Sequence, residues 1–178
     1  LETVKVDTGA TNRPFRMPVQ WVSRPNLDFR GFCGTVASGS IAPGDEVAVP
    51  SSGQTSRVKS IVTMDGELEE ATAGQAVTLT LEDEIDISRG DLLCAAGDRP
   101  DFADQFEARL VWMHEEPLLP GRSYLLKTGA KTIPVQVSGL KYKVNVNTLE
   151  HQAGKTLQLN EIGICNFSLG NPVAFDPY

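Results

Sequence analysis

Short apolar runs separated by glycine, proline and small polar residues recur along the whole sequence, and they constrain the fold more than any other feature. The segment from Arg24 to Val62 shows the pattern, because five glycines divide it into short stretches rich in valine, isoleucine and phenylalanine. Such runs between turn residues are typical of β-strands, and apolar residues at helical spacing are scarce. The sequence therefore predicts an all-β protein.

The first half predicts six strands. They fall at residues 17–22, 31–39, 46–50, 57–62 and 73–82, with a last short strand after the turn Arg89-Gly90-Asp91. Turns at Pro43-Gly44-Asp45 and Ser51-Ser52-Gly53-Gln54 are hairpin signals, and Gly34 within a strand indicates a bulge or a close backbone approach. Six closely spaced strands favour a closed antiparallel barrel, because closure removes exposed strand edges.

A second strand-rich block follows the polar segment Gly97–Asp104, which we interpret as a domain boundary. Residues 105–113 alternate apolar and polar side chains, two strands surround Thr128-Gly129-Ala130, and the last 22 residues predict two or three strands. We therefore expect two consecutive small antiparallel β-barrels, over residues 1–98 and 103–178.

Charge and composition exclude several functions. The net charge is −7, and acidic clusters at 65–70 and 82–86 would repel a phosphate backbone, so we expect no nucleic-acid binding. These carboxylates read as solvated loops rather than an acid–base pair. The three cysteines and two histidines lack zinc-ligand spacing, so buried reduced thiols and no metal are expected. No apolar run predicts a membrane span or signal peptide, and we expect a cytoplasmic protein.

Two stretches carry a family resemblance. Arg30, Gly31, Gly34, Thr35 and Val36, followed by SGSIAPGDEV, resemble domain 2 of elongation factor Tu-like GTPases, in which an R-G-x-x-G-T-V strand precedes a hairpin. The longer blocks VQWVSRPNLDFRGFCGTVASGSI, QFEARLVWMHEEPLLPGRSYLLKTGAK and KYKVNVNTLE resemble the large, GTP-binding subunit of bacterial sulfate adenylyltransferase. This resemblance covers nearly the whole chain.

The resemblance implies a subunit that couples GTP hydrolysis to the formation of adenylylsulfate and pyrophosphate from ATP and sulfate. It also implies a small catalytic subunit as partner and an N-terminal GTPase domain that binds GTP and Mg²⁺. Neither SSGQTS nor GRSYLLKTG fits the phosphate-binding pattern G-x-x-x-x-G-K-[ST], so we expect no cofactor and no catalytic residue in this chain. By this resemblance the chain corresponds to the second and third domains, with the third truncated and its barrel incomplete. Whether an adenylylsulfate kinase follows stays open.

Four polar residues precede the strand at 31–39: Arg24, Asn26, Asp28 and Arg30. Folding alone does not call for them, so they are our candidate interface with the GTPase domain or the partner subunit. The alternative is a self-satisfied loop in which Asp28 pairs with an arginine and Asn26 forms a turn. We expect Trp21 and Trp112 in the core. Two other functions stay open, a translation-factor-like RNA-binding module and a barrel that binds a small molecule.

Overall fold

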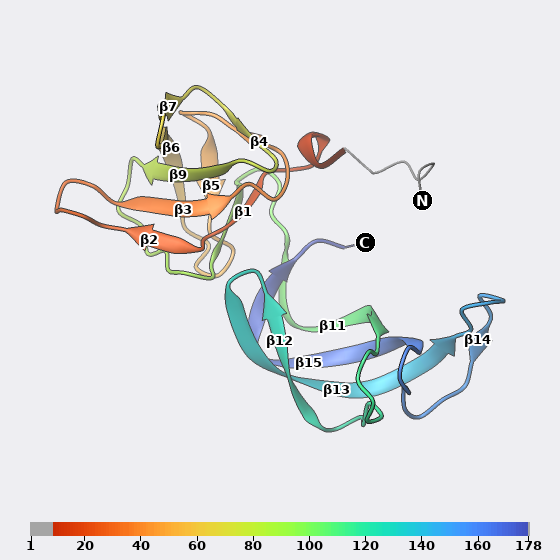
Figure 1. The fold of residues 1–178 in the computed structure, drawn as a ribbon. Helices are drawn as coiled ribbons and strands as arrows, with labels where there is room; N and C mark the ends of the chain where they lie inside the picture. Colours follow the sequence, from red (N-terminus) through yellow and green to blue (C-terminus); the bar gives the residue numbers. More distant parts are fainter. Residues whose placement is uncertain (1–8, 178) are drawn as a thin grey trace. The chain divides into compact units, whose positions relative to one another are not determined.

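The computed structural model describes residues 9–177 as two compact β-rich units (Figure 1). In this part of the chain a single 3-10 turn, η1 (Gly9–Asn12), accompanies the strands. The prediction of an all-β fold is confirmed. The first unit comprises residues 9–101, 128–131 and 174–177, and the second comprises 102–127 and 132–173. The chain thus crosses between the units at Asp101/Phe102, and two short later segments belong to the first unit.

Ten strand segments form the described first unit. They are β1 (Arg16–Pro18), β2 (Trp21–Ser23), β3 (Gly31–Thr35), β4 (Ser40–Ile41), β5 (Glu46–Ala48), β6 (Thr55–Thr63), β7 (Gly66–Leu68), β8 (Ala71–Thr72), β9 (Ala76–Leu81) and β10 (Leu92–Ala95). The main sheet has the order β1-β10-β5-β6-β9-β3-β2, β7 pairs with β6, and β4 pairs with β8. The predicted turns lie where the sequence places them, with Gly44, Gly53 and Gly90 at positive φ.

Strands β1 and β2 close this barrel. They belong to one segment that the sequence predicts as a single strand, but the chain changes partner in its middle. The Val19 amide donates to the Asp91 carbonyl at 2.8 Å, whereas the Gln20 amide donates to the Cys33 carbonyl at 2.9 Å. The two ends of the sheet order are therefore neighbours in the chain, and the six predicted strand positions form a closed barrel.

Side chains fill the barrel interior. The core contains Phe15, Met17, Phe32, Ile61 and Leu79 among its buried members. On β3 and β9 the buried residues Phe32, Val77 and Leu79 alternate with the half-buried Cys33 and Thr78, which is the two-residue period of a strand. At the crossing of β3 and β1, a Cβ on Gly34 would lie 2.5 Å from the Pro18 carbonyl oxygen. The close approach predicted at Gly34 is therefore present.

The second unit is built on β11 (Asp101–Val111), β12 (Ser123–Thr128), β13 (Lys131–Val144), β14 (His151–Gln152) and β15 (Ile162–Phe175). Its sheet has the order β11-β15-β13-β12, and β14 pairs with β13. Within the described residues this order ends at β11 on one side and β12 on the other, so the strand pairs leave an open sheet. An open strand edge is what the sequence predicts for this block.

One strand prediction in this unit is wrong. Residues 162–175 form a single long strand, β15, and not two or three. Gly170 and Pro172 do not interrupt it because the register with β13 ends at Leu169, opposite Val135. A proline beyond the last paired residue removes no hydrogen bond from that ladder.

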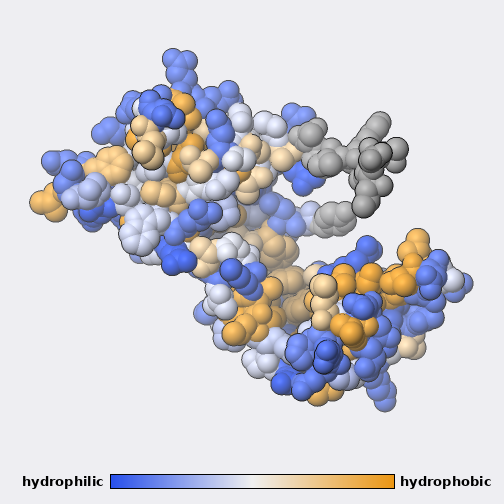
Figure 2. Space-filling model, viewed as in Figure 1, coloured by the Kyte–Doolittle hydropathy of each residue, from blue (hydrophilic) through white to orange (hydrophobic). Residues whose placement is uncertain are grey.

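The core of the second unit is small. Its buried cluster consists of Leu118, Val137, Leu157 and Cys165, with Trp112 packed against them. Trp112 thus lies in the core, as expected, and its indole N–H donates to the Glu116 carbonyl at 2.7 Å. Large apolar side chains remain exposed on this unit, among them Met113, Leu125 and Leu149. Figure 2 shows hydrophobic residues interspersed with hydrophilic ones across the visible face of the second unit.

Candidate functional site

The candidate interface residues lie on the loop between β2 and β3, at the left of Figure 1. The Asn26 side-chain oxygen accepts a hydrogen bond from the Asp28 amide at 3.0 Å. This is the Asn26 turn expected if the loop satisfies its own polar groups. At the start of the loop, Arg24 forms an exposed ion pair with Glu84 at 3.4 Å. An exposed pair of this kind contributes little to stability.

Beside this loop lies a groove of about 380 Å³ on the first unit. Residues 27–30 form one wall, β6 and β9 form the floor, and residues 82–84 form a further wall. Asp28 and Arg30 line it, Glu84 lines it as the partner of Arg24, and Asn26 does not. Three segments far apart in the sequence thus meet at one place.

Glycine at position 31 allows the loop to lie on the barrel. A Cβ there would come within 2.4 Å of the Thr78 methyl group and 2.8 Å of the Phe29 ring. The aromatic ring of Phe29 therefore lies close to the β3 backbone, where a larger residue would displace it. On the floor, the hydroxyl groups of Ser60 and Thr80 form a hydrogen bond of 2.8 Å.

Arg30 is held without an acidic partner. Its guanidinium lies 5.3 Å from the centre of the Phe32 ring, a cation–π distance, and donates to the Ile87 carbonyl at 3.5 Å. The sequence alternative in which Asp28 pairs with an arginine is not what the structure shows, since the ion pairs of the described residues include none of Asp28. The loop leaves both charges available to a binding partner.

Trp21 corrects a second expectation. Its side chain is 63% exposed, at the first residue of β2, and so it is not a core residue. The acidic residues Asp83, Glu84 and Asp86 are exposed, as predicted, with Asp83 accepting a hydrogen bond from the Ser56 hydroxyl at 2.9 Å.

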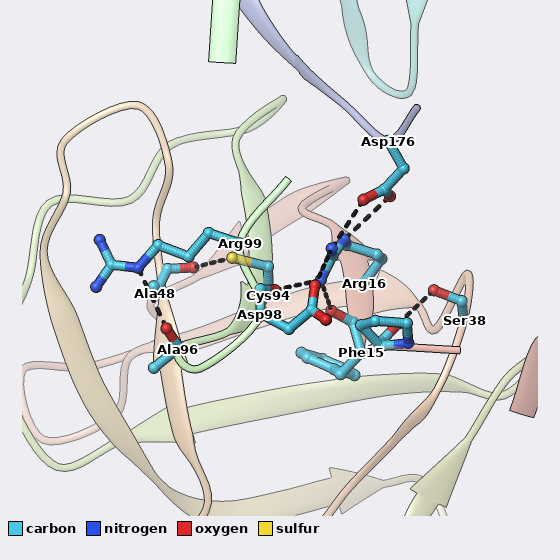
Figure 3. A network of polar contacts seen from close by, with 10 residues as sticks. Phe15, Arg16, Ser38, Ala48, Cys94, Ala96, Asp98, Arg99 and Asp176 are labelled. Carbon is cyan, nitrogen blue, oxygen red and sulfur yellow. Dashed lines mark hydrogen bonds and ion pairs between the residues drawn. The ribbon is translucent and has the colours of Figure 1, made fainter. Parts of the chain in front are cut away.

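A buried arginine that sequence reasoning did not single out lies on β1 (Figure 3). Arg16 is 6% exposed, and its guanidinium bonds to both carboxylate oxygens of Asp176, at 2.8 and 3.1 Å, and to Asp98. It also donates to the carbonyls of Phe15 and Asp98. Burial lowers the pKa of Arg16, but the hydrogen bonds to Asp176 and Asp98 outweigh it and raise the pKa above its ordinary value. The only sequence signal was an arginine within an apolar strand.

Lys131 forms a further ion pair with Asp91, at 2.9 Å, and both residues belong to the first unit. Burial alone would raise the pKa of Asp91, yet the hydrogen bonds from Lys131 and from the Ser88 amide lower it below its ordinary value. The cysteines are unpaired thiols, and burial raises the pKa of Cys94 and Cys165. Burial of these two thiols fits the expected structural role, whereas Cys33 is only half-buried.

Two further features are absent from residues 9–177. Histidine, cysteine and acidic side chains form no group suited to a metal ion. No helix in this range has the length and apolar character that a bilayer span requires.

Comparisons with known proteins place each block in a family. Residues 33–94 match the elongation factor Tu domain 2 family, and residues 105–178 match the GTP-eEF1A C-terminal domain-like family. The chain is 57% identical over its full length to the sulfate adenylyltransferase subunit 1 of Shewanella woodyi and to the bifunctional enzyme NodQ of Rhizobium sp. (strain N33). It spans 38% and 28% of the lengths of those two proteins.

Solved translation factors share the fold. The chain is 19% identical to sup35 complexed with GMPPNP, with a TM-score of 0.80 over 98% of this chain and 43% of that one. Elongation factor SelB from Methanococcus maripaludis is 21% identical, with a TM-score of 0.76 over 98% of this chain and 39% of that one. At these identities the likeness extends to the fold alone.

Proposed function

Because the chain belongs to the sulfate adenylyltransferase subunit 1 proteins, with their elongation factor Tu-like β-barrels, we propose that it is the barrel portion of a GTP-driven sulfate adenylyltransferase. The observation that carries this proposal is the 57% identity over all 178 residues to a protein of that name. The chain spans little more than a third of that relative, so the activity belongs to the larger protein.

In this proposal the complex is cytoplasmic and serves sulfate assimilation. It joins ATP and sulfate into adenylylsulfate and pyrophosphate, with adenylyl transfer in a small catalytic subunit. GTP and Mg²⁺ bind in an N-terminal GTPase domain. The barrels are scaffold and coupling elements that respond to the nucleotide state through packed surfaces. The absence of a phosphate-binding loop motif from the 178 residues supports a role without nucleotide hydrolysis in this chain.

The loop between β2 and β3 is the proposed coupling surface. Arg24 and Asp28 are exposed, whereas Arg30 is half-buried against Phe32 and has no carboxylate partner in the described structure. Polar groups that have no strong partner within the fold are available to bind another protein or domain. Their loss is therefore expected to affect coupling more than folding.

The test uses the full-length large subunit with its small subunit. We expect Arg24→Ala with Asn26→Ala to lower the GTP-stimulated rate of adenylylsulfate synthesis severalfold, with little change in melting temperature. Lys155→Ala, an exposed substitution in the second unit, is the control. An unchanged rate, or a large loss of thermal stability, would contradict the coupling role. RNA binding by the chain in a titration would instead favour the translation-factor alternative, which the charge of −7 opposes.

A further inference from the structure

The groove beside the β2–β3 loop is lined by apolar, hydroxyl and charged side chains. Phe29, Phe32, Val62 and Leu81 contribute apolar surface to it. Leu27, at the tip of the loop, is 87% exposed although it is a large apolar side chain. Apolar side chains with charged residues beside them are typical of the surfaces that proteins use to bind one another.

The charged side chains that line the groove are mostly acidic, and most of their carboxylates are unpaired in the described structure. Five carboxylates line the groove, against two cations, Arg30 and Lys59. Within residues 9–177 the carboxylates of Glu67 and Glu82 make no hydrogen bond or ion pair, and neither does that of Asp28. The groove therefore carries a net negative charge that nothing in the described chain neutralises.

This charge selects the occupant. Nucleic acid, a nucleotide and sulfate are all anions, and the five carboxylates would repel them. A lysine or arginine side chain fits both the apolar and the acidic residues of the groove. Its aliphatic stem packs on apolar surface, while its charged head reaches a carboxylate. Complementary charge of this kind steers association and fixes the orientation of a partner.

We propose that the groove receives a segment of the small catalytic subunit that carries lysine or arginine, with Leu27 and Phe29 as the apolar contacts and Glu67 and Glu82 as the charged ones. This inference rests on the proposed function, which supplies the partner. It goes further in assigning the docking surface to one groove of the first barrel and in stating the chemistry of the segment that binds there.

The first test measures binding of the small subunit to the full-length large subunit. Glu67→Lys with Glu82→Lys is expected to raise the dissociation constant at least about tenfold, mainly through slower association, and to reduce its salt dependence. Both side chains are exposed, so the variant is expected to fold. Glu46→Lys is the matched control, since Glu46 is exposed on β5 and does not line the groove. Equal affinity of the groove variant and the control would overturn the inference.

The second test identifies the occupant directly. Val62, half-buried on the groove floor, is replaced by the photo-crosslinking residue p-benzoylphenylalanine in the assembled complex. A crosslink to a lysine- or arginine-bearing segment of the small subunit supports the proposal. A crosslink to the GTPase domain, to a second copy, or to no protein overturns it. Adenylylsulfate synthesis by the unmodified complex is measured alongside. Its absence would refute the proposed function, whereas an active complex with an empty groove refutes only the docking surface.

Discussion

Arg16 is the clearest case of a single side chain whose role depends on distant partners. It lies on β1, whereas Asp176 lies 160 residues further along the chain, and the two form a bidentate contact (Figure 3). Bidentate arginine–carboxylate pairs combine energy with geometric specificity. The guanidinium also bonds to Asp98, so it keeps a partner when Asp176 is removed.

This arrangement predicts unequal effects for the two partners. We expect Asp176→Asn to lower the free energy of unfolding of the first unit by about 1 kcal/mol, because Asp98 and two carbonyls still satisfy Arg16. Arg16→Ala is expected to cost about 2–3 kcal/mol more, since it removes every one of these bonds and leaves a cavity. Urea unfolding followed through amide NMR signals of β9 and β10 measures both. Equal losses would show that Asp176 alone holds the arginine.

Asp91 predicts a pH dependence. Its hydrogen bonds from Lys131 and Ser88 lower its pKa from the ordinary 3.8, so the folded state favours the carboxylate. The stabilisation is therefore fully present above the unfolded value and is lost as pH falls through the lower folded pKa. We expect Asp91→Asn to cost about 1 kcal/mol at pH 7, after allowance for the partial exposure of Lys131, and nearly nothing at pH values below the folded pKa. Asp86→Asn, at an exposed carboxylate, is the control; a cost that is independent of pH would refute the assignment.

At the scale of elements, the segment that contains β1 and β2 decides whether the first barrel closes. It passes from β10 to β3 within two residues, and Gly34 of β3 lies against the Pro18 carbonyl at that point. Backbone cannot move aside as a flexible side chain can. A methyl group added at Gly34 therefore has no free space at this crossing.

We expect Gly34→Ala to destabilise the first unit by about 2–3 kcal/mol, the usual cost of overpacking an interior site. Gly97→Ala provides the control, because a Cβ at Gly97 would meet no atom within 4 Å and its φ is not positive. Thermal unfolding of the two variants separates the cases. Similar melting temperatures would mean that the β1 segment shifts to accept the methyl group.

At the scale of the whole molecule, the two units differ in how much apolar surface they bury. The first has a core cluster of sixteen buried residues and a closed sheet, whereas the buried cluster of the second has four and its sheet is open in the described residues. Because burial of apolar surface is the main source of stability, the units are not expected to unfold together. We expect amide signals of β13 and β15 to be lost at lower urea than those of β6 and β9. A single coincident transition would contradict this.

The chain as a whole is expected to bind no GTP and to form no adenylylsulfate by itself. The 178 residues contain no phosphate-binding loop motif. Calorimetric titration of the purified chain with GTP and Mg²⁺ is expected to show no heat of binding. Micromolar affinity would refute the division of labour proposed for the larger protein.

Local patterns in the sequence are enough to predict most of the strands, the turns and the family. Alternating side chains and glycines at turns act within a few residues, so β5, β6, β9 and the hairpin at Gly129 follow from local patterns, as does the close approach at Gly34. The blocks around Arg30 and Gly31 were specific enough to identify the family, and the candidate interface followed from four polar residues in a loop.

Which of these residues contact one another depends on the fold of the whole chain. Strand pairing joins positions that are far apart in sequence, and no local pattern records the partner. The sequence therefore did not reveal the pairing of Arg16 with Asp176, the exposure of Trp21 or the single strand β15. The groove also arises from contacts between residues that are far apart in sequence. Residues 27–30, 59–62 and 82–84 each read as a loop or strand alone, and they become a charged hollow because the closed barrel brings them side by side.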